Sequence, residues 1–209
     1  CVLGLFEGVV TGAADGYGRM TDRPAATLLH TGPGLGNGLA NLHNARKART
    51  PMVNIVGEHA TYHIRHDAPL TSNIEGIAAP VSDWVKTSAD AASVARDGAR
   101  AIEEAKTFPG RIATLILPAD TAWNEAKGAA QIQEILGPKK VEASQVLNCA
   151  EALRSGEPML IMLGGRALRR EALETAGRIS RKTGAALWME SGTARVQRGA
   201  GIVSVPRIP

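Results

Sequence analysis

Glu7 is the residue of this chain whose surroundings most clearly suggest chemistry. Residues 2–6 form an apolar run of strand length, and residues 8–19 carry glycine and alanine at helical spacings. A carboxylate at such a junction is predicted to lie at the carboxyl edge of a sheet, where open α/β folds bind their ligands. A plain first-turn glutamate, stabilised by the helix dipole, is the alternative interpretation.

The glycine-rich segment 32–38 is a second candidate, because it follows an apolar run and precedes a predicted helix. The dinucleotide-binding fingerprint fails in both possible registers, since Asn37 or Leu39 occupies the third glycine position. The Gly-Lys-Ser/Thr of a P-loop is absent, and Pro33 removes an amide donor that a phosphate would need. The segment is predicted to be a loop that passes close to a flat ligand or a partner subunit, or else a tight turn.

Three histidines, His59, His63 and His66, follow the third apolar run at spacings of four and three. On a helix, this spacing would place metal ligands on one face. Gly57 and Pro69 bracket the segment and favour a loop instead. The three side chains are therefore predicted to contact substrate beside a strand end or to be solvated, and we expect no metal site.

Two further residues leave nucleotide binding open. Glu58 ends a predicted strand, where a Rossmann fold places the acid that binds the ribose, so a nicotinamide-dependent enzyme stays an alternative. Arg166 follows two glycines at another predicted strand end and is a candidate nucleotide contact, although a simple turn explains it as well.

The order of the predicted elements indicates an α/β fold with a parallel sheet flanked by helices. We expect one α/β domain over residues 1–118, a linker over 119–142 and a second α/β unit over 143–209. The second unit has two predicted strands, fewer than a stable sheet needs, and the chain starts without Met. We therefore expect it to be part of a longer protein. Predicted strands cover 2–6, 25–30, 52–56, 84–87, 111–117, 159–163 and 185–189, and predicted helices cover 8–19, 39–48, 74–78, 90–106, 143–155 and 169–183.

Composition narrows the possible partners. The net charge is +4 in 209 residues, but 24 basic residues are interleaved with 20 acidic ones. The basic clusters at 46–49 and 166–170 lack interleaved aromatic residues, so we expect no nucleic-acid binding. No apolar stretch is long enough for a membrane span, and Cys1 and Cys149 cannot build a disulfide framework. These features predict a cytoplasmic protein with no membrane partner.

Four sequence blocks, taken together, resemble the amino-terminal pyrimidine-binding domain of thiamine diphosphate enzymes, above all the acetolactate synthase group. The resemblance covers residues 2–118, and the remainder is similar to the start of the Rossmann-like middle domain of that family. The blocks are Phe6-Glu7-Gly8, Ala13-Ala14-Asp15-Gly16-Tyr17-Gly18-Arg19-Met20, Thr31-Gly32-Pro33-Gly34 with Asn37, and Pro51-Met52-Val53-Asn54-Ile55-Val56-Gly57.

The resemblance implies a catalytic role for Glu7. In the family, this glutamate hydrogen-bonds N1′ of the aminopyrimidine ring, so that the amino group of the cofactor deprotonates C2 of the thiazolium. The resemblance also implies a 2-keto acid substrate that loses carbon dioxide in a lyase or transferase reaction. The cofactor-binding residues that it implies are Glu7, Thr31, Gly32, Pro33, Gly34 and Asn37.

The resemblance further implies Mg²⁺, which the family binds in a carboxyl-terminal domain that this chain lacks. The chain alone is therefore expected to be inactive. FAD is possible in the middle domain. Because the family builds each site between subunits, we expect a homodimer or homotetramer.

Three departures from the family pattern leave the substrate open. Phe6 replaces the usual histidine, Gly8 replaces a glutamine, and segment 67–77 lacks an Ala-Phe-Gln-Glu block. The pyruvate specificity of acetolactate synthases therefore cannot be carried over. A relative that keeps the fold without the chemistry remains a further alternative.

Overall fold

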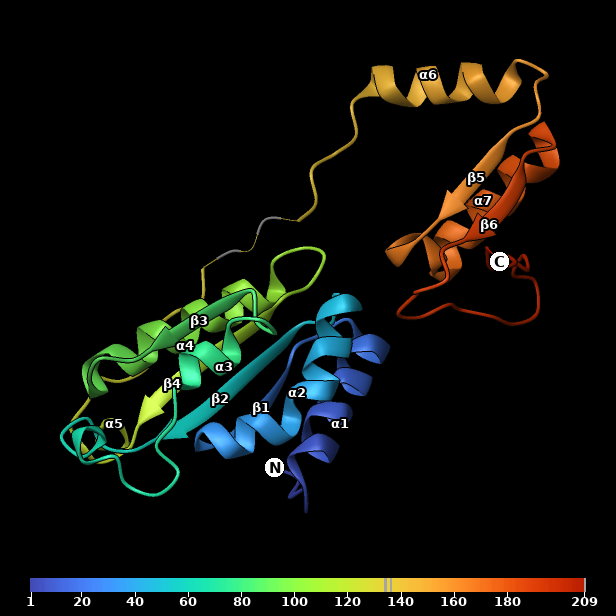
Figure 1. The fold of residues 1–209 in the computed structure, drawn as a ribbon. Helices are drawn as coiled ribbons and strands as arrows, with labels where there is room; N and C mark the ends of the chain where they lie inside the picture. The colour runs from blue at the N-terminus through green and yellow to red at the C-terminus, as the bar shows by residue number, and fades with distance from the viewer. Residues whose placement is uncertain (134, 136, 209) are drawn as a thin grey trace. The chain divides into compact units, whose positions relative to one another are not determined.

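A computed structural model describes residues 1–133, 135 and 137–208, and in it the chain forms two compact units, Cys1–Pro138 and Lys139–Pro209 (Figure 1). Each unit has a hydrophobic core of its own. The domain limits expected from the sequence stay a prediction. Residues 134 and 136 of the expected linker, and residue 209, lie outside the described residues.

A parallel sheet of four strands forms the centre of the first unit, which confirms the expected α/β class. The strand order is β1-β2-β4-β3, and every pairing is parallel. The carboxyl ends of the strands therefore meet at one edge, where His30 is opposite Gly57 and Glu58 is opposite Pro118. The strands are β1 (Ala25–His30), β2 (Met52–Glu58), β3 (Trp84–Thr87) and β4 (Ile112–Pro118).

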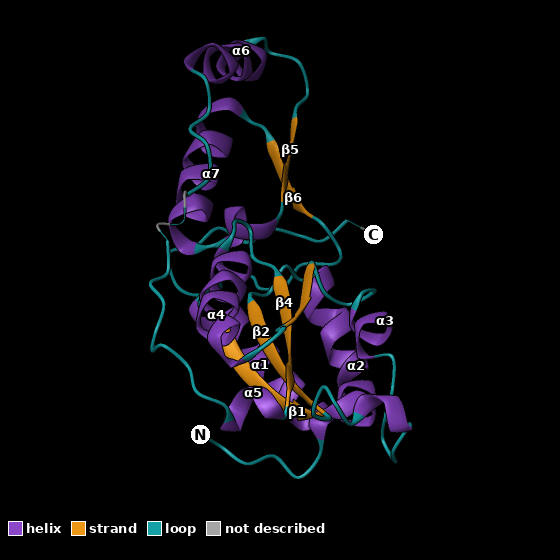
Figure 2. Cartoon of the chain, turned by 90° about the vertical axis from the view of Figure 1, so that its left-hand side faces the viewer, coloured by secondary structure: helices purple, strands orange, loops and turns teal. Residues whose placement is uncertain are grey.

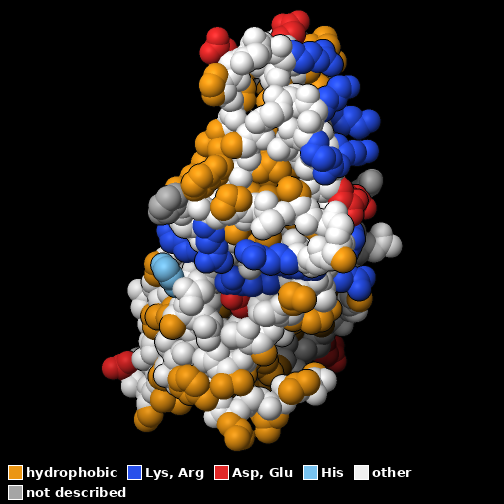
Figure 3. Space-filling view, turned by 90° about the vertical axis from the view of Figure 1, so that its right-hand side faces the viewer, with side chains coloured by type: hydrophobic (Ala, Val, Ile, Leu, Met, Phe, Trp, Pro, Cys, Tyr) orange, Lys and Arg blue, Asp and Glu red, His pale blue; other side chains and the backbone are white. Residues whose placement is uncertain are grey.

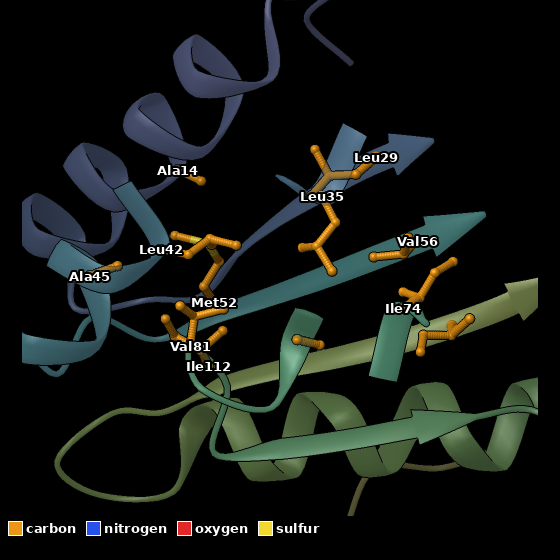
Figure 4. Packing of buried hydrophobic residues seen from close by; sticks show 12 residues of the cluster. Ala14, Leu29, Leu35, Leu42, Ala45, Met52, Val56, Ile74, Val81 and Ile112 are labelled. Atoms are coloured by element: carbon orange, nitrogen blue, oxygen red, sulfur yellow. The ribbon is translucent and has the colours of Figure 1, made fainter. Parts of the chain in front are cut away.

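Helices lie against both faces of this sheet (Figure 2). On one face, α1, α2 and α3 pack over a core that includes Leu42, Met52 and Val56 (Figure 4). On the other face, alanines of α4 pack against Val53 and Leu115. The helical segments are α1 (Glu7–Thr21), α2 (Thr31–Lys47), the 3₁₀ turn η1 (Ile64–His66), α3 (Ile74–Ala78), α4 (Ala91–Lys106) and α5 (Asp120–Trp123).

The burial of each strand follows its place in the sheet. β2 and β4 lie in the interior of the sheet and are almost continuously buried, as expected for parallel strands that are covered on both faces. β1 is an edge strand with an alternating pattern, so that Leu28 and His30 are exposed while Leu29 is buried.

A ladder of buried polar side chains crosses the sheet at one level. Thr27 donates to Oδ1 of Asn54 at 2.7 Å, and Nδ2 of Asn54 donates to Oγ1 of Thr114 at 3.2 Å. Oγ of Ser82 lies 2.7 Å from the same Thr114 hydroxyl. Thr27, Asn54 and Thr114 are register partners on β1, β2 and β4. If one strand shifted by one residue against its neighbour, these buried polar side chains would lose their hydrogen-bond partners. The ladder therefore fixes the strand register, and with it the alignment of the strand ends.

The second unit contains a parallel strand pair joined by helical segments. Leu168 and Leu173 pack against Leu187 and Met189 in its core. The helix α6 buries none of its residues. Figure 3 shows Lys and Arg side chains gathered along one side of this unit. Its elements are α6 (Ala143–Arg154), β5 (Leu160–Leu163), the 3₁₀ segment η2 (Gly165–Leu168), α7 (Arg170–Thr183) and β6 (Ala186–Met189).

Two predictions about local structure are wrong. Residues 2–6 form no strand, and Val2 and Leu5 are almost fully exposed, because none of the strands in the described part of the chain pairs with them. The glycine-rich segment 32–38 is no loop, because α2 already begins at Thr31. Pro33 is tolerated there because the amides of a first helical turn have no intrahelical acceptor.

The helices formed by the described residues are all too short or too polar to cross a membrane.

Candidate functional site

Glu7 is the first residue of α1, and its carboxylate faces the start of α2. Nδ2 of Asn37 donates a hydrogen bond to Oε2 of Glu7 at 3.1 Å. A side-chain carbon added at Gly34 would lie 3.4 Å from Oε1 of the same carboxylate. Glu7 therefore meets Gly34 and Asn37, two residues of α2 that are distant from it in the sequence.

Close packing of α1 on α2 brings these residues together. Oγ1 of Thr11 in α1 donates to the carbonyl of Gly38 in α2 at 3.2 Å, and a side-chain carbon at Gly38 would lie 2.8 Å from Thr11. In return, Nδ2 of Asn41 donates to the carbonyl of Gly8 at 2.6 Å. The small residues of both helices thus allow the backbones to approach, and this approach carries Glu7 to the amino end of α2.

The amino end of α2 lies directly after the carboxyl end of β1, so Glu7 is at the ligand-binding edge of the sheet, although no strand precedes it. His30, the last residue of β1, is exposed there, and its Cβ would lie 3.8 Å from a side-chain carbon at Gly34. His30 was not among the candidates that the sequence pattern indicated. Its place at the end of an apolar run, just before the glycine-rich segment, was the signal that would have identified it.

The other predicted cofactor-binding residues do not all join Glu7. A side-chain carbon at Gly32 would overlap Ser72, so Gly32 faces the long loop after β2 instead. Thr31 is buried, and its hydroxyl donates to the carbonyl of His30 at 2.8 Å. Pro33 is exposed in the first turn of α2. The structure therefore places Gly34 and Asn37 beside the carboxylate, and Gly32 under the loop.

The three predicted histidines do lie together. The ring centroids of His59 and His63 are 5.5 Å apart, and those of His63 and His66 are 5.7 Å apart. Their segment is a loop with one short 3₁₀ turn at Ile64–His66, as the bracketing glycine and proline indicated. Among the described residues, no group of three His, Cys, Asp or Glu side chains has the arrangement of a metal site.

The nucleotide alternatives receive little support from the contacts. Oε1 of Glu58 accepts a hydrogen bond from the amide of His59 at 2.7 Å, so this carboxylate caps the start of its own loop. In the second unit, the amide of Gly165 donates to Oε1 of Glu190 at 3.2 Å. The carboxylate of Glu190 thus occupies the glycine turn beside Arg166. A phosphate bound there would need the same Gly165 amide as a donor.

The carboxylate of Glu7 is held by one neutral partner. In the described part of the chain, Glu7 forms no ion pair, and its single side-chain hydrogen bond comes from a neutral amide. Asn37 orients one carboxylate oxygen, and the other faces Gly34, where there is no side chain. A carboxylate with one oxygen oriented and the other open can accept a further hydrogen bond.

Residues 1–77 match the family described as "Thiamine pyrophosphate enzyme, N-terminal TPP binding domain". Over 208 residues the chain is 51% identical to the "Putative acetolactate synthase large subunit IlvX" of Mycobacterium tuberculosis, a match that covers 99% of this chain and 40% of that protein. It is 30% identical over 166 residues to a benzoylformate decarboxylase of Pseudomonas aeruginosa, covering 77% of this chain and 31% of that protein.

A solved structure is also similar. The thiamine diphosphate-dependent 4-hydroxybenzoylformate decarboxylase of Rhodococcus jostii matches 90% of this chain and 37% of that chain, with a TM-score of 0.81 and 26% identity. The chain thus spans 40% or less of the length of each of these three proteins.

Proposed function

We propose that this chain, which belongs to the thiamine diphosphate-dependent enzymes, forms the pyrimidine-binding part of the active site of a 2-keto acid decarboxylase or carboligase. The observation that carries the proposal is the carboxylate of Glu7, held by Asn37 at the carboxyl edge of the sheet. The names of the relatives support a decarboxylation as the reaction type.

The residues at this edge fit an aminopyrimidine ring. Oε1 of Glu7 accepts no hydrogen bond from the described residues, so it can face a ring nitrogen. Gly34 leaves room beside that oxygen because it has no side chain. These two residues and Asn37 are the ones we assign to the cofactor. The other three residues that the resemblance implied affect the cofactor only indirectly, because they shape the start of α2: Thr31, Gly32 and Pro33.

When bound, thiamine diphosphate supplies a nucleophilic carbon and an electron sink for decarboxylation. Glu7 contributes the proton that is shared with the ring nitrogen N1′, and Asn37 keeps the carboxylate pointing toward it. His30 is exposed at the same edge, where its imidazole can exchange a proton with the bound substrate.

The partners and cofactors outside this chain belong to the same proposal. We infer that Mg²⁺ is held by a part of the protein that this chain does not contain, and that the assembly is a homodimer or homotetramer working in the cytoplasm. FAD in the second unit is the least supported of these assignments, since Glu190 already occupies the glycine turn.

The test is carbon dioxide release by the complete protein that carries this chain, with and without thiamine diphosphate and Mg²⁺. Glu7→Gln keeps the size of the side chain and removes the proton exchange, so release should fall by about 100-fold or more, while the melting temperature stays near that of the unchanged protein. Full activity in a folded Glu7→Gln protein would refute the role of Glu7. Tight cofactor binding with no release from any keto acid would favour a relative that keeps the fold without the chemistry.

A further inference from the structure

The segment 59–72, which we call the histidine loop, is an ordered structure at the same edge of the sheet as Glu7. It leaves from the end of β2 and returns over the amino end of α2, where Ser72 packs against Gly32. Thr61 fixes its first half, because its amide and hydroxyl donate to the carboxylate of Asp120 at 2.9 and 2.6 Å. Nε2 of His59 reaches the carbonyl of Pro69 at 3.1 Å and closes the loop on itself.

The histidine loop has an excess of cationic and N–H donor groups. It contains three imidazoles and Arg65, and Asp67 is its only carboxylate. Arg65 is exposed, and it has no ion pair with any residue that the structure describes. Asp120, the carboxylate that contacts the start of the loop, is bound by Thr61. The terminal nitrogens of the Arg65 guanidinium and the imidazole of His63 form no hydrogen bond with the described residues, so they can bind an anion from solution.

The hydrogen bonds indicate which nitrogen carries the proton in two of the rings when they are neutral. A carbonyl can only accept, so Nε2 of His59 carries a proton toward Pro69. Nε of Arg65 donates to Nε2 of His66 at 3.4 Å, so a neutral His66 carries its proton on Nδ1. The imidazole of His63 lies between these two rings and forms no hydrogen bond with the described residues. The loop thus offers N–H donors from His63 and His66 next to the guanidinium.

We propose that Arg65, His63 and His66 form a subsite for a second acidic group of the substrate, so that the enzyme takes a 2-keto acid with an additional carboxylate. This inference rests on the proposed function. Arg65 provides the charge and a planar pair of donors that matches a carboxylate, and the two imidazoles add hydrogen bonds.

The carboxylate that leaves as carbon dioxide is a poor candidate for this subsite. It loses its charge in the reaction, so a cation that binds it stabilises the starting state more than the transition state and slows the step. A carboxylate that stays on the product has no such penalty.

The test is a titration of the full 209-residue chain with ¹³C-labelled histidine, followed by NMR in a phosphate-free buffer at pH 7 without thiamine diphosphate. The probes are 2-oxoglutarate, pyruvate, benzoylformate and inorganic phosphate. We expect 2-oxoglutarate to shift the His63 and His66 signals and to bind about tenfold or more tightly than pyruvate. His43 lies in α2, near the other end of the helix, and serves as the internal reference.

Arg65→Gln should weaken the binding of 2-oxoglutarate by about tenfold or more, because a charged hydrogen-bond donor is lost. Lys47→Gln is the matched control, since it removes one exposed positive charge in the last turn of α2 and should leave binding unchanged. Equal binding of pyruvate, benzoylformate or phosphate would overturn the subsite, and so would an equal loss in both variants. An absence of shifts would also overturn it, while the role of Glu7 would still be judged by its own activity test.

Discussion

At the scale of single residues, two neighbours define the surroundings of the Glu7 carboxylate: the side-chain amide of Asn37 and Gly34, which has no side chain. Asn37 holds one oxygen of Glu7 in place, and Gly34 keeps the space beside the other oxygen open. Neither residue carries a charge, so neither forms an ion pair with the carboxylate. The contribution of the neighbours is therefore geometric.

His30 is the residue whose replacement gives the sharpest test at this scale. It is exposed and forms no part of the core, so His30→Ala should leave the melting temperature almost unchanged. If its imidazole exchanges a proton with substrate, kcat should fall by about 100-fold or more with a smaller change in KM. Steady-state kinetics of the complete protein would measure both. Unchanged kcat would place His30 outside the reaction.

At the scale of elements, the contact between α2 and the histidine loop depends on glycine at one position. Gly32→Ala would force a methyl group into Ser72 and should destabilise the first unit by about 1–3 kcal/mol. Gly36→Ala in the same helix meets no atom within 4 Å and should instead stabilise it by about 0.5–1 kcal/mol. Urea unfolding of the two variants would measure the difference. Equal stabilities of the two variants would show that the histidine loop moves away from the added methyl group with no loss of stability.

The link between the histidine loop and α5 should be sensitive to acid. The hydrogen bonds from the Thr61 hydroxyl and amide hold the pKa of Asp120 below its usual range. The pKa of Asp120 is therefore lower in the folded state than in the unfolded state. The stabilisation from these hydrogen bonds is fully present at a pH above the pKa of the unfolded state. It is lost as the pH falls through the pKa of the folded state.

We therefore expect the amide of Thr61 to lose its protection from hydrogen exchange below about pH 4. In Asp120→Asn, the amide should be less protected and independent of pH over the same range. The amide of Ser93, which donates to Asp90 at the start of α4, is a second acid-sensitive probe in the same unit. Protection of Thr61 that persists well below that pH would show that other contacts hold the loop.

At the scale of the whole molecule, the chain consists of two units with separate cores, Cys1–Pro138 and Lys139–Pro209. Residues 124–133 between α5 and the end of the first unit are exposed and contain no helix or strand. A protease can cleave such a segment without any prior unfolding of the domain.

Trypsin should therefore cleave after Lys127, or after the equally exposed Lys139 or Lys140, before it cleaves after Lys106 at the end of α4. Mass spectrometry of the early fragments would identify the site. A first cut after Lys106 would show that the end of α4 opens more readily than this segment.

The sequence by itself determined the α/β class, the parallel sheet and most element limits. Apolar runs and helical periods are local patterns, so α3 over 74–78 and β3 over 84–87 appear where they were predicted. It also made Glu7 a candidate, because an acid between an apolar run and a helix is visible without a fold, and the role of Glu7 stays a prediction. The resemblance of the four blocks to the thiamine diphosphate enzymes was confirmed as well.

Only the tertiary structure decided which residues stand beside Glu7. Gly32 and Gly34 are alike in sequence, yet one packs under Ser72 and the other faces the carboxylate, because they lie on different sides of α2. The apolar run 2–6 forms no strand, since a strand depends on a partner that a local pattern cannot supply. His30 joined the site for the same reason, because parallel pairing and helix packing bring distant residues to one edge of the sheet.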